Sequence, residues 1–249
     1  MQNAGRIHGR SLRECSGLAA SRHFTNVLWA HNDSGNAGIL YGARRDGTLI
    51  GKWKITGKKL FDWEDITADN EGNLYLADIG DNHGVRPAVW VHRIKEPNPA
   101  TRGGTVAIEH SWRLQFPGGP RNAESLAIFE GYAYVITKCS QAPAQVFRFP
   151  LTDTTNDVLL ELVAEMTITS PITCMAISPS GKVLAVISPE GAFAYKLDHG
   201  LIQCRSNWTA RTPFRNAKIE GCTFTPDGLL SVEENGQMYL FTDPIFRPE

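Results

Sequence analysis

Acidic and amide side chains gather in three short segments, which are HNDSGN at 31–36, DWED at 62–65 and DIGDN at 78–82. Asp, Asn and Gly also form tight turns, so each segment alone has an ordinary structural explanation. Three glutamates, Glu64, Glu124 and Glu220, occupy equivalent positions of an internal repeat. Carboxylates that converge repel one another and need a cation, a proton or a basic partner. These residue types therefore indicate a cation site or an acid–base site.

Calcium is the cation that this donor set fits best. It takes six to eight oxygen ligands in flexible geometry, whereas magnesium and manganese need stricter octahedral arrangements. We expect Glu64, Glu124 and Glu220 to be the metal ligands. The alternative is that these carboxylates are structural residues at the strand ends, held by backbone amides and by Lys138 or Arg121, and bind no cation.

Hydrolysis at such a site requires a group that accepts a proton from water. Asp81 and His83 follow a predicted strand, and we expect them to be this base; His31 is a further candidate. A structural hydrogen bond or solvent exposure is the alternative for either histidine. Trp63, between Asp62 and Glu64, is the aromatic expected near the ligand. The full set predicted to bind ligand is Asn32, Asp33, Trp63, Asp65, Asp78, Asn82, Lys138 and Glu233.

Several other chemistries lack their motifs. The sequence contains no G-x-S-x-G nucleophile elbow, P-loop, dinucleotide fingerprint or H-E-x-x-H zinc helix. The five cysteines form no C-x-x-C pair, so a zinc ribbon or thioredoxin-type motif is excluded, and we expect most of them to be buried.

The composition limits partners and compartment. A net charge of -1 provides no overall attraction for nucleic acid, and no apolar run is long enough for a membrane-spanning helix. The start MQNAGRIHGRSL lacks the apolar region of a signal peptide. The protein is periplasmic or secreted if a signal peptide has been removed, and otherwise cytoplasmic.

The internal repeat indicates the architecture. Its five segments are SGLAAS from Ser16, EDITAD from Glu64, ESLAIF from Glu124, TCMAIS from Thr173 and EGCTFT from Glu220, at a mean spacing of about 51 residues. Each is followed by a second strand, at 27–33, 73–79, 132–138, 183–188 and 229–234. Third strands are expected at 38–43, 88–94, 144–149, 191–197 and 236–241, and fourth strands at 49–55, 109–116, 160–168 and 201–208.

Four strands at a period near 50 predict an all-β protein, a five-bladed β-propeller with four antiparallel strands per blade, over a single domain at 1–249. The fifth unit lacks an outer strand, and we expect the N-terminal stretch from Ala4 to Leu12 to supply it and close the ring. A β-sandwich is the alternative, but it does not require this period. First strands begin and second strands end on one face, so their polar end residues predict an acidic mouth. The second unit is longer, with its excess at 79–88 and 95–104.

The motifs D-W-E-D-I at 62–66, D-I-G-D-N at 78–82 and N-A-E-S-L-A at 122–127 resemble those of SdiA-regulated-type bacterial propellers. More distantly, the chain resembles gluconolactonase (SMP-30) and NHL-like propellers. The resemblance implies a polar central mouth that often holds a metal. In gluconolactonase-like enzymes an inner-strand glutamate is a metal ligand, which Glu64, Glu124 or Glu220 would match, although Glu220-Gly221 is followed by Cys222 where that group has proline.

The function expected from these features is a calcium-binding propeller that hydrolyses a small ester, lactone or phosphoester. The alternative is a non-catalytic module that binds a carbohydrate, peptide or protein. In either case the ligand lies at the acidic mouth, and we expect a monomer.

Overall fold

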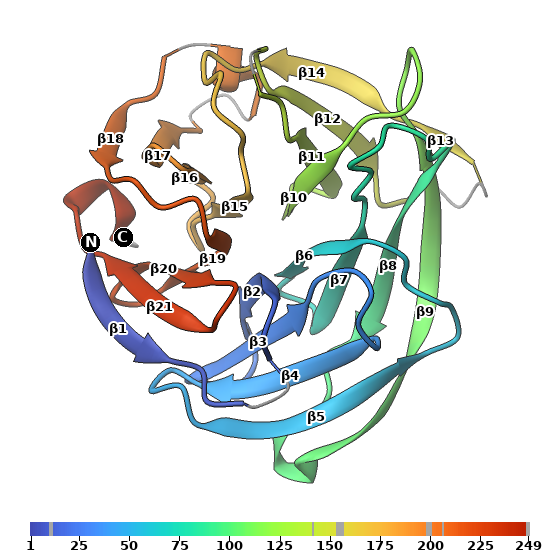
Figure 1. Ribbon diagram of the computed structural model, residues 1–249, viewed down its shortest axis with the longest axis vertical. Coiled ribbons are helices and arrows are strands. Elements are labelled where there is room, and N and C mark those ends of the chain that lie inside the picture. Colours follow the sequence, from blue (N-terminus) through green and yellow to red (C-terminus); the bar gives the residue numbers. More distant parts are fainter. Residues whose placement is uncertain (10–11, 141, 153–156, 198–200, 206, 248–249) are drawn as a thin grey trace.

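The backbone forms a ring of sheets around a central axis (Figure 1). This computed structural model describes residues 1–9, 12–140, 142–152, 157–197, 201–205 and 207–247. The innermost strands are β2 (Cys15–Ala20), β6 (Trp63–Ala68), β10 (Ala123–Phe129), β15 (Cys174–Ile177) and β19 (Ile219–Thr225). Each contacts the next, and β19 contacts β2, so these five strands form a closed inner ring. They are the five segments of the sequence repeat.

The second strands are β3 (Val27–Asn32), β7 (Asn73–Asp78), β11 (Tyr132–Thr137), β16 (Val183–Ser188) and β20 (Gly228–Glu233). The third strands are β4 (Ile39–Arg44), β8 (Val89–Lys95), β12 (Gln145–Pro150), β17 (Gly191–Lys196) and β21 (Gln237–Phe241). The outer strands are β5 (Leu49–Thr56), β9 (Gly103–Gln115), β14 (Glu161–Glu165), β18 (Ala210–Pro213) and β1 (Gln2–Arg6). The predicted all-β class is confirmed.

The strands are connected in four sheets. Three are four-stranded, in the orders β1-β21-β20-β19, β10-β11-β12-β14 and β15-β16-β17-β18. The fourth, nine-stranded sheet has the order β2-β3-β4-β5-β9-β8-β7-β6, with the short β13 (Val158–Leu159) also on β9. Its two antiparallel halves meet where β5 runs parallel to β9, from Lys52 opposite Gly103 to Thr56 opposite Ala107. The long second unit therefore extends its outer strand along the first unit.

The N-terminal strand pairs antiparallel with β21, as the sequence predicted, although it covers Gln2–Arg6 rather than Ala4–Leu12. The predicted strand at 201–208 is wrong. Residues Leu201–Arg205 form the 3₁₀ helix η2, residue 206 lies outside the described part, and β18 starts only at Ala210. Two more 3₁₀ turns are η1 (Pro99–Thr101) and η3 (Pro244–Phe246).

Apolar side chains fill the spaces between neighbouring sheets. Trp29 and Trp53 pack edge to face in one such layer, and Trp112 lies in the next. Four of the five cysteines are buried and all five are free. Within the described residues, no helix is long and apolar enough to cross a membrane.

Polar side chains join the innermost strands to one another. The Ser16 hydroxyl donates to the Glu64 carbonyl at 2.9 Å, and the Thr173 hydroxyl donates to the Ile219 carbonyl at 2.7 Å. The Leu126 amide donates to the Asp65 carboxylate at 2.8 Å. These bonds replace the backbone ladder that radially packed sheets lack at the axis, and they fix the inner ring.

Candidate functional site

A cavity of about 240 Å³ lies where the innermost strands begin and the second strands end. Its lining consists of Glu14, Cys15, Ser16, Asp33, Glu64, Asn82, Glu124, Lys138, Glu220 and Glu234. Six of these residues, Asp33, Glu64, Asn82, Glu124, Lys138 and Glu220, are among those that the sequence marked for a site. The lining carries six carboxyl groups and one ammonium group, so the cavity is strongly acidic in a nearly neutral protein.

Three carboxyl groups of this cavity, those of Glu64, Glu124 and Glu220, have raised pKa values and so hold protons more tightly than ordinary carboxyls do. Burial, and then the neighbouring Glu124 and Asp33, raise the pKa of Glu64 well above its usual range. Burial also raises the pKa of Glu220 to about 8, although Lys138 opposes the shift. A bound cation would supply positive charge beyond that of the single ammonium group of Lys138.

Glu124 and Lys138 form the cavity's ion pair. The Lys138 Nζ lies 2.6 Å from Glu124 Oε1, and the side chain of Glu124 is only 4% exposed. Glu124 Oε2 is buried and has no hydrogen-bond partner. Buried carboxylate oxygens are normally satisfied, so this atom indicates that the cavity accommodates a further donor or cation.

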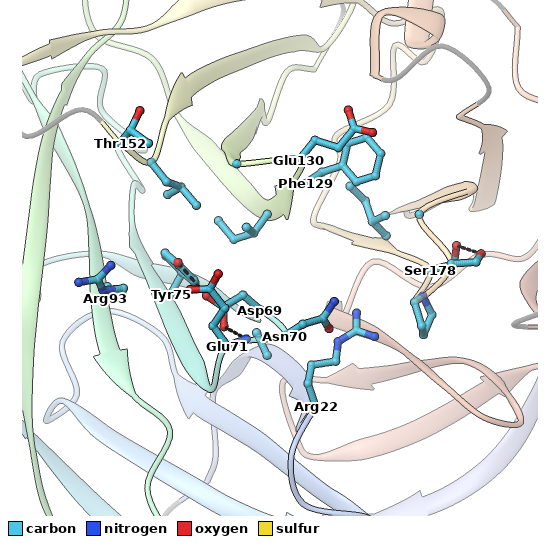
Figure 2. A pocket seen from close by; sticks show the side chains of 18 residues that line it. Arg22, Asp69, Asn70, Glu71, Tyr75, Arg93, Phe129, Glu130, Thr152 and Ser178 are labelled. Atoms are coloured by element: carbon cyan, nitrogen blue, oxygen red, sulfur yellow. Dashed lines mark hydrogen bonds between the residues drawn. The ribbon is translucent and has the colours of Figure 1, made fainter.

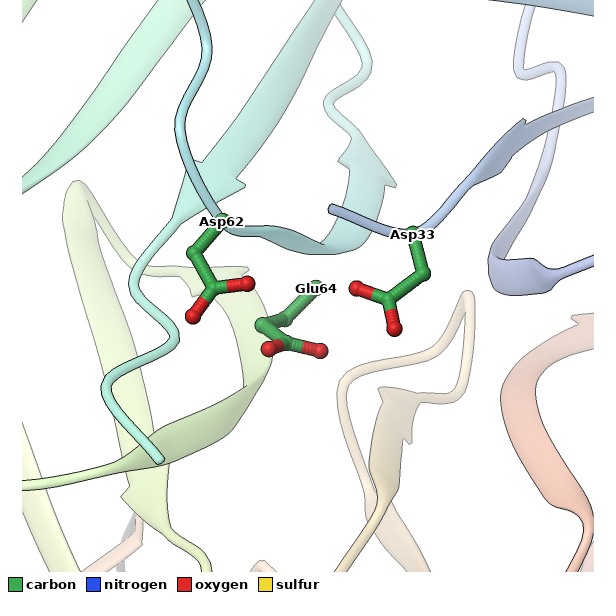
Figure 3. A group of neighbouring side chains, drawn as sticks. All are labelled: Asp33, Asp62 and Glu64. Carbon is green, nitrogen blue, oxygen red and sulfur yellow. The ribbon is translucent and has the colours of Figure 1, made fainter. Parts of the chain in front are cut away.

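A second group of carboxylates lies at the edge of the cavity. Asp33, Asp62 and Glu64 each offer one oxygen, and these oxygens lie within 4.8 Å of one another (Figure 3). Among the described residues, this is the one group of three potential metal ligands within that distance. The three predicted ligands Glu64, Glu124 and Glu220 all line the cavity, but the carboxylate oxygens within this distance of one another are those of Glu64, Asp33 and Asp62. Asp62, which belongs to the D-W-E-D segment, was not among the predicted metal ligands.

Backbone packing fixes this acidic triad of Asp33, Asp62 and Glu64. The buried Asp78 carboxylate accepts the amides of Phe61 and Asp62, both at 3.0 Å, and the Gly80 amide donates to the Asp62 carbonyl at 3.2 Å. A Cβ at Gly80 would lie 2.1 Å from Glu64 Oε1 and 2.5 Å from Asp62 Oδ2. A larger residue at position 80 would therefore displace both carboxylates.

The loop that supports Gly80 and the segment that carries Asp33 are also held by side chains. The Arg86 guanidinium donates to the Gly80 carbonyl and to the Asp78 carboxylate. On the other side of the triad, Asn32 accepts the amides of Arg13 and Glu14, and the Asp33 amide donates to the Glu14 carbonyl. Asn32 and Asp78, predicted to bind ligand, therefore position the triad instead.

Three further residues predicted to bind ligand have structural partners. Trp63 is only 3% exposed and stacks on His31 at 3.9 Å, so it is not a rim aromatic. Asp65 is 1% exposed and bonds the amides of Ile66 and Leu126. Glu233 is buried and accepts hydrogen bonds from three side chains, those of Asn216, Asn235 and Tyr239. The polar pattern of the sequence marked these positions but did not reveal which oxygens the protein itself uses.

Neither residue predicted as the base lines the cavity. Both carboxylate oxygens of Asp81 accept backbone amides, from Val85 and Arg86 at 2.9 Å, which fixes the loop. His83 is exposed on the same loop. His31 is fully buried, and burial lowers its pKa to about 3. The catalytic role of Asp81 and His83 therefore has no support from their placement.

A larger cavity of about 590 Å³ lies beside the turns that follow β6, β10 and β15, at the opposite end of the innermost strands (Figure 2). Its carboxylate Asp69 already accepts the amides of Glu71 and Asn73 and the hydroxyl of Tyr75. No group of clustered metal ligands is found there among the described residues. The acidic cavity is therefore the better candidate for chemistry.

Comparison with known proteins informs the fold. No family model matches the sequence, and no curated protein matches it either. A luciferin-regenerating enzyme of known structure superposes with a TM-score of 0.58 at 11% identity, over 94% of this chain and 80% of that one. The fold is β-propeller-like. A hydrazine synthase from Kuenenia stuttgartiensis aligns with a TM-score of 0.48 at 12% identity, over 92% of this chain, which spans 58% of that chain.

Proposed function

We propose that this chain is a five-bladed propeller of the SdiA-regulated type that binds calcium at its acidic mouth and hydrolyses a small neutral ester or lactone. The five-blade assignment takes the nine-stranded sheet as two blades joined by the β5–β9 pair and each four-stranded sheet as one more. The closed inner ring of five strands supports this division.

The acidic triad is the observation that carries the cation proposal. Its three carboxylates are the hard oxygen donors that calcium prefers, and Asp33, Asp62 and Glu64 would hold the ion. The unpartnered Glu124 Oε2 and the space that Gly80 leaves for two carboxylates fit the same group. When bound, a divalent cation polarises a carbonyl oxygen and activates water.

Two residues of the cavity are suited to the proton and charge changes of hydrolysis. In this reaction a water oxygen bonds to the acyl carbon, the acyl–oxygen bond breaks, and a proton passes from water to the leaving alcohol. Glu220, with a pKa of about 8, is the group that we assign to accept and return this proton. The Lys138 ammonium, held by Glu124, is the group that we assign to stabilise negative charge on the acyl oxygen.

The charge of the cavity selects among the substrates expected from the sequence. The lining has six carboxyls and one lysine, so it carries no excess positive charge even with one divalent cation bound and Glu64 and Glu220 protonated. Like charges repel strongly where water is excluded, so an anionic phosphoester is disfavoured. A neutral ester or lactone avoids this cost.

The test is calcium binding by calorimetry, followed by turnover of a lactone and aryl ester panel. We expect Asp33→Asn and Glu64→Gln to weaken calcium binding by tenfold or more and to abolish turnover. Asp46→Asn removes the same charge from an exposed turn and serves as the control. Wild-type protein that binds no calcium, or variants that bind it as tightly as wild type, would refute the metal site.

A non-catalytic module for a cationic ligand is the second candidate. No aromatic side chain occurs in the cavity lining among the described residues, so a stacking platform for a sugar ring is missing there. The carboxyls instead suit an amine, such as a lysine side chain of a peptide. Tight binding of a lysine-containing peptide without turnover of any panel member would favour this function.

A further inference from the structure

Two large apolar side chains are exposed on the segments that adjoin the acidic triad and the cavity. Phe61 is 60% exposed and directly precedes Asp62 in the segment that leads into β6. Val85 is 70% exposed on the loop between β7 and β8, three residues after the cavity residue Asn82. Only five large hydrophobic side chains are exposed in the described part of the chain, and two of them lie one and three residues from Asp62 and Asn82, which belong to the triad and to the cavity lining.

Single exposed hydrophobic residues are common, so exposure alone indicates nothing. These two differ because buried carboxylates hold both segments in place. Asp78, which is 0% exposed, accepts the Phe61 amide at 3.0 Å, and Asp81, which is 4% exposed, accepts the Val85 amide at 2.9 Å. The Arg86 guanidinium ties the two segments together through Asp78 and the Gly80 carbonyl. The backbone that carries the two apolar side chains is therefore held in place.

The cavity itself offers almost no apolar contact. Its lining is polar or charged apart from Cys15, and its volume of about 240 Å³ holds only a small polar head. An apolar substituent on that head must therefore extend over the rim. Phe61 and Val85 are the large apolar side chains exposed on the segments that adjoin Asp62 and Asn82, and the Lys59 Nζ lies 5.2 Å from the centroid of the Phe61 ring.

We propose that Phe61 and Val85 form an apolar lip that binds the alkyl or aryl chain of the substrate, so that the protein prefers medium-chain esters or lactones. This proposal rests on the proposed function for the identity of the head group, and it adds the substrate's apolar part. Asp78 and Asp81 act as positioning residues for the lip.

The proposed lip predicts how kcat/KM depends on the length of the substrate's acyl chain. A fully buried methylene group adds up to about fourfold in affinity, and an open lip that covers about half of the chain adds about twofold. Three or four such groups then raise kcat/KM by on the order of tenfold between acetyl and hexanoyl p-nitrophenyl esters. We expect Phe61→Ser and Val85→Ser to reduce this ratio to about twofold. Leu159→Ser, at a side chain 68% exposed on the outer strand β13, is the matched control and keeps the wild-type ratio.

A binding measurement separates the lip from the hydrolytic function. Alkylammonium ions from methyl to hexyl place a cation in the acidic cavity of the metal-free protein, and calorimetry gives their affinity. We expect the same gain with chain length and the same loss in the Phe61 and Val85 variants. A preference for hexylammonium that is lost when Phe61 is replaced, together with no turnover of any ester, would refute the hydrolase function but support the lip.

Two results would overturn the lip. The first is chain-length selectivity that is absent in wild-type protein or unchanged in both serine variants. The second is a concentration-dependent dimer, detected by light scattering, that Phe61→Ser dissociates, because the apolar residues would then serve a protein contact. Metal-dependent turnover with no chain preference would keep the proposed function and refute only the lip.

Discussion

Replacing Gly80 by alanine tests the geometry of the acidic triad without changing any charge. The added Cβ would lie 2.1 Å from Glu64 Oε1 and 2.5 Å from Asp62 Oδ2, well inside van der Waals contact. The two carboxylates must therefore move by roughly an ångström. Displacements of groups that orient metal ligands typically reduce metal affinity by 10–100-fold, and we expect a loss of that size for calcium.

The same loss can be read from thermal unfolding. At free calcium of about 100 times the wild-type Kd, binding adds about 2.7 kcal/mol to the free energy of unfolding. A 10–100-fold weaker site leaves about 0.4–1.4 kcal/mol by the same relation. In a chain of this size 1 kcal/mol corresponds to about 2–4 °C in Tm, so the calcium-induced shift falls from roughly 5–11 °C to roughly 1–6 °C.

Gly38→Ala is the matched control, because a Cβ there lies 3.5 Å from its nearest neighbour, Leu60 Cδ1, which is ordinary contact. We expect wild-type calcium affinity from it. In the absence of calcium, Gly80→Ala should also lower the free energy of unfolding by about 1–3 kcal/mol through overpacking. A folded Gly80→Ala protein with wild-type calcium affinity in calorimetry would show that Glu64 and Asp62 do not bind the ion.

Three further perturbations test the ring and the cavity. Deleting residues 1–12 removes β1 and the buried Ile7 and Leu12, and we expect the free energy of unfolding in urea to fall by several kcal/mol. Deleting only residues 1–6 should lower it by less. Wild-type stability after the longer deletion would contradict ring closure. The pKa of Glu220 is raised from 4.5 to about 8 in the folded state, so the folded state binds more protons in this window and the metal-free protein should lose stability as pH rises through it. Glu220 contributes up to about 1.4 kcal/mol per pH unit to this loss. Glu220→Gln should reduce the slope by that contribution, and an unchanged slope would refute the assignment. Lys138→Met leaves the buried Glu124 unpaired and should lower the free energy of unfolding by about 1–3 kcal/mol, which is less than for a fully buried pair because Lys138 is 31% exposed. Adding Glu124→Gln should restore most of this stability. A double variant as unstable as the single one would exclude the ion pair as the cause.

The repeat made the innermost strands predictable because each of them must place small and apolar residues in the same crowded ring. The strand expected at 201–208 failed because Leu201 and Cys204, three residues apart, are both buried on one side of a 3₁₀ turn. An apolar run of this length does not distinguish a strand from such a turn.

The acidic mouth was predictable in composition but not in detail. The sequence identified where Asp, Asn and Glu accumulate, yet the carboxylates of Asp81 and Asp65 accept hydrogen bonds from backbone amides. The triad joins Asp33 of one unit to Asp62 and Glu64 of the next, and this proximity depends on how adjacent units pack. Which carboxylates accept backbone hydrogen bonds depends on the folded structure, so composition alone cannot predict which ones are available to bind a cation.

The pairing of β1 with β21 has a consequence for how the protein is made. Asn3 and Gln237 bond across 234 residues of chain, so β1 leaves the ribosome long before its partner exists. Until then the ring is open, and β2 has no β19 beside it. Contacts at such separation slow folding and expose unpaired strand edges. A circular permutant that attaches β1 to the C-terminal end converts this closure into a local contact, and we expect it to refold faster than the natural chain.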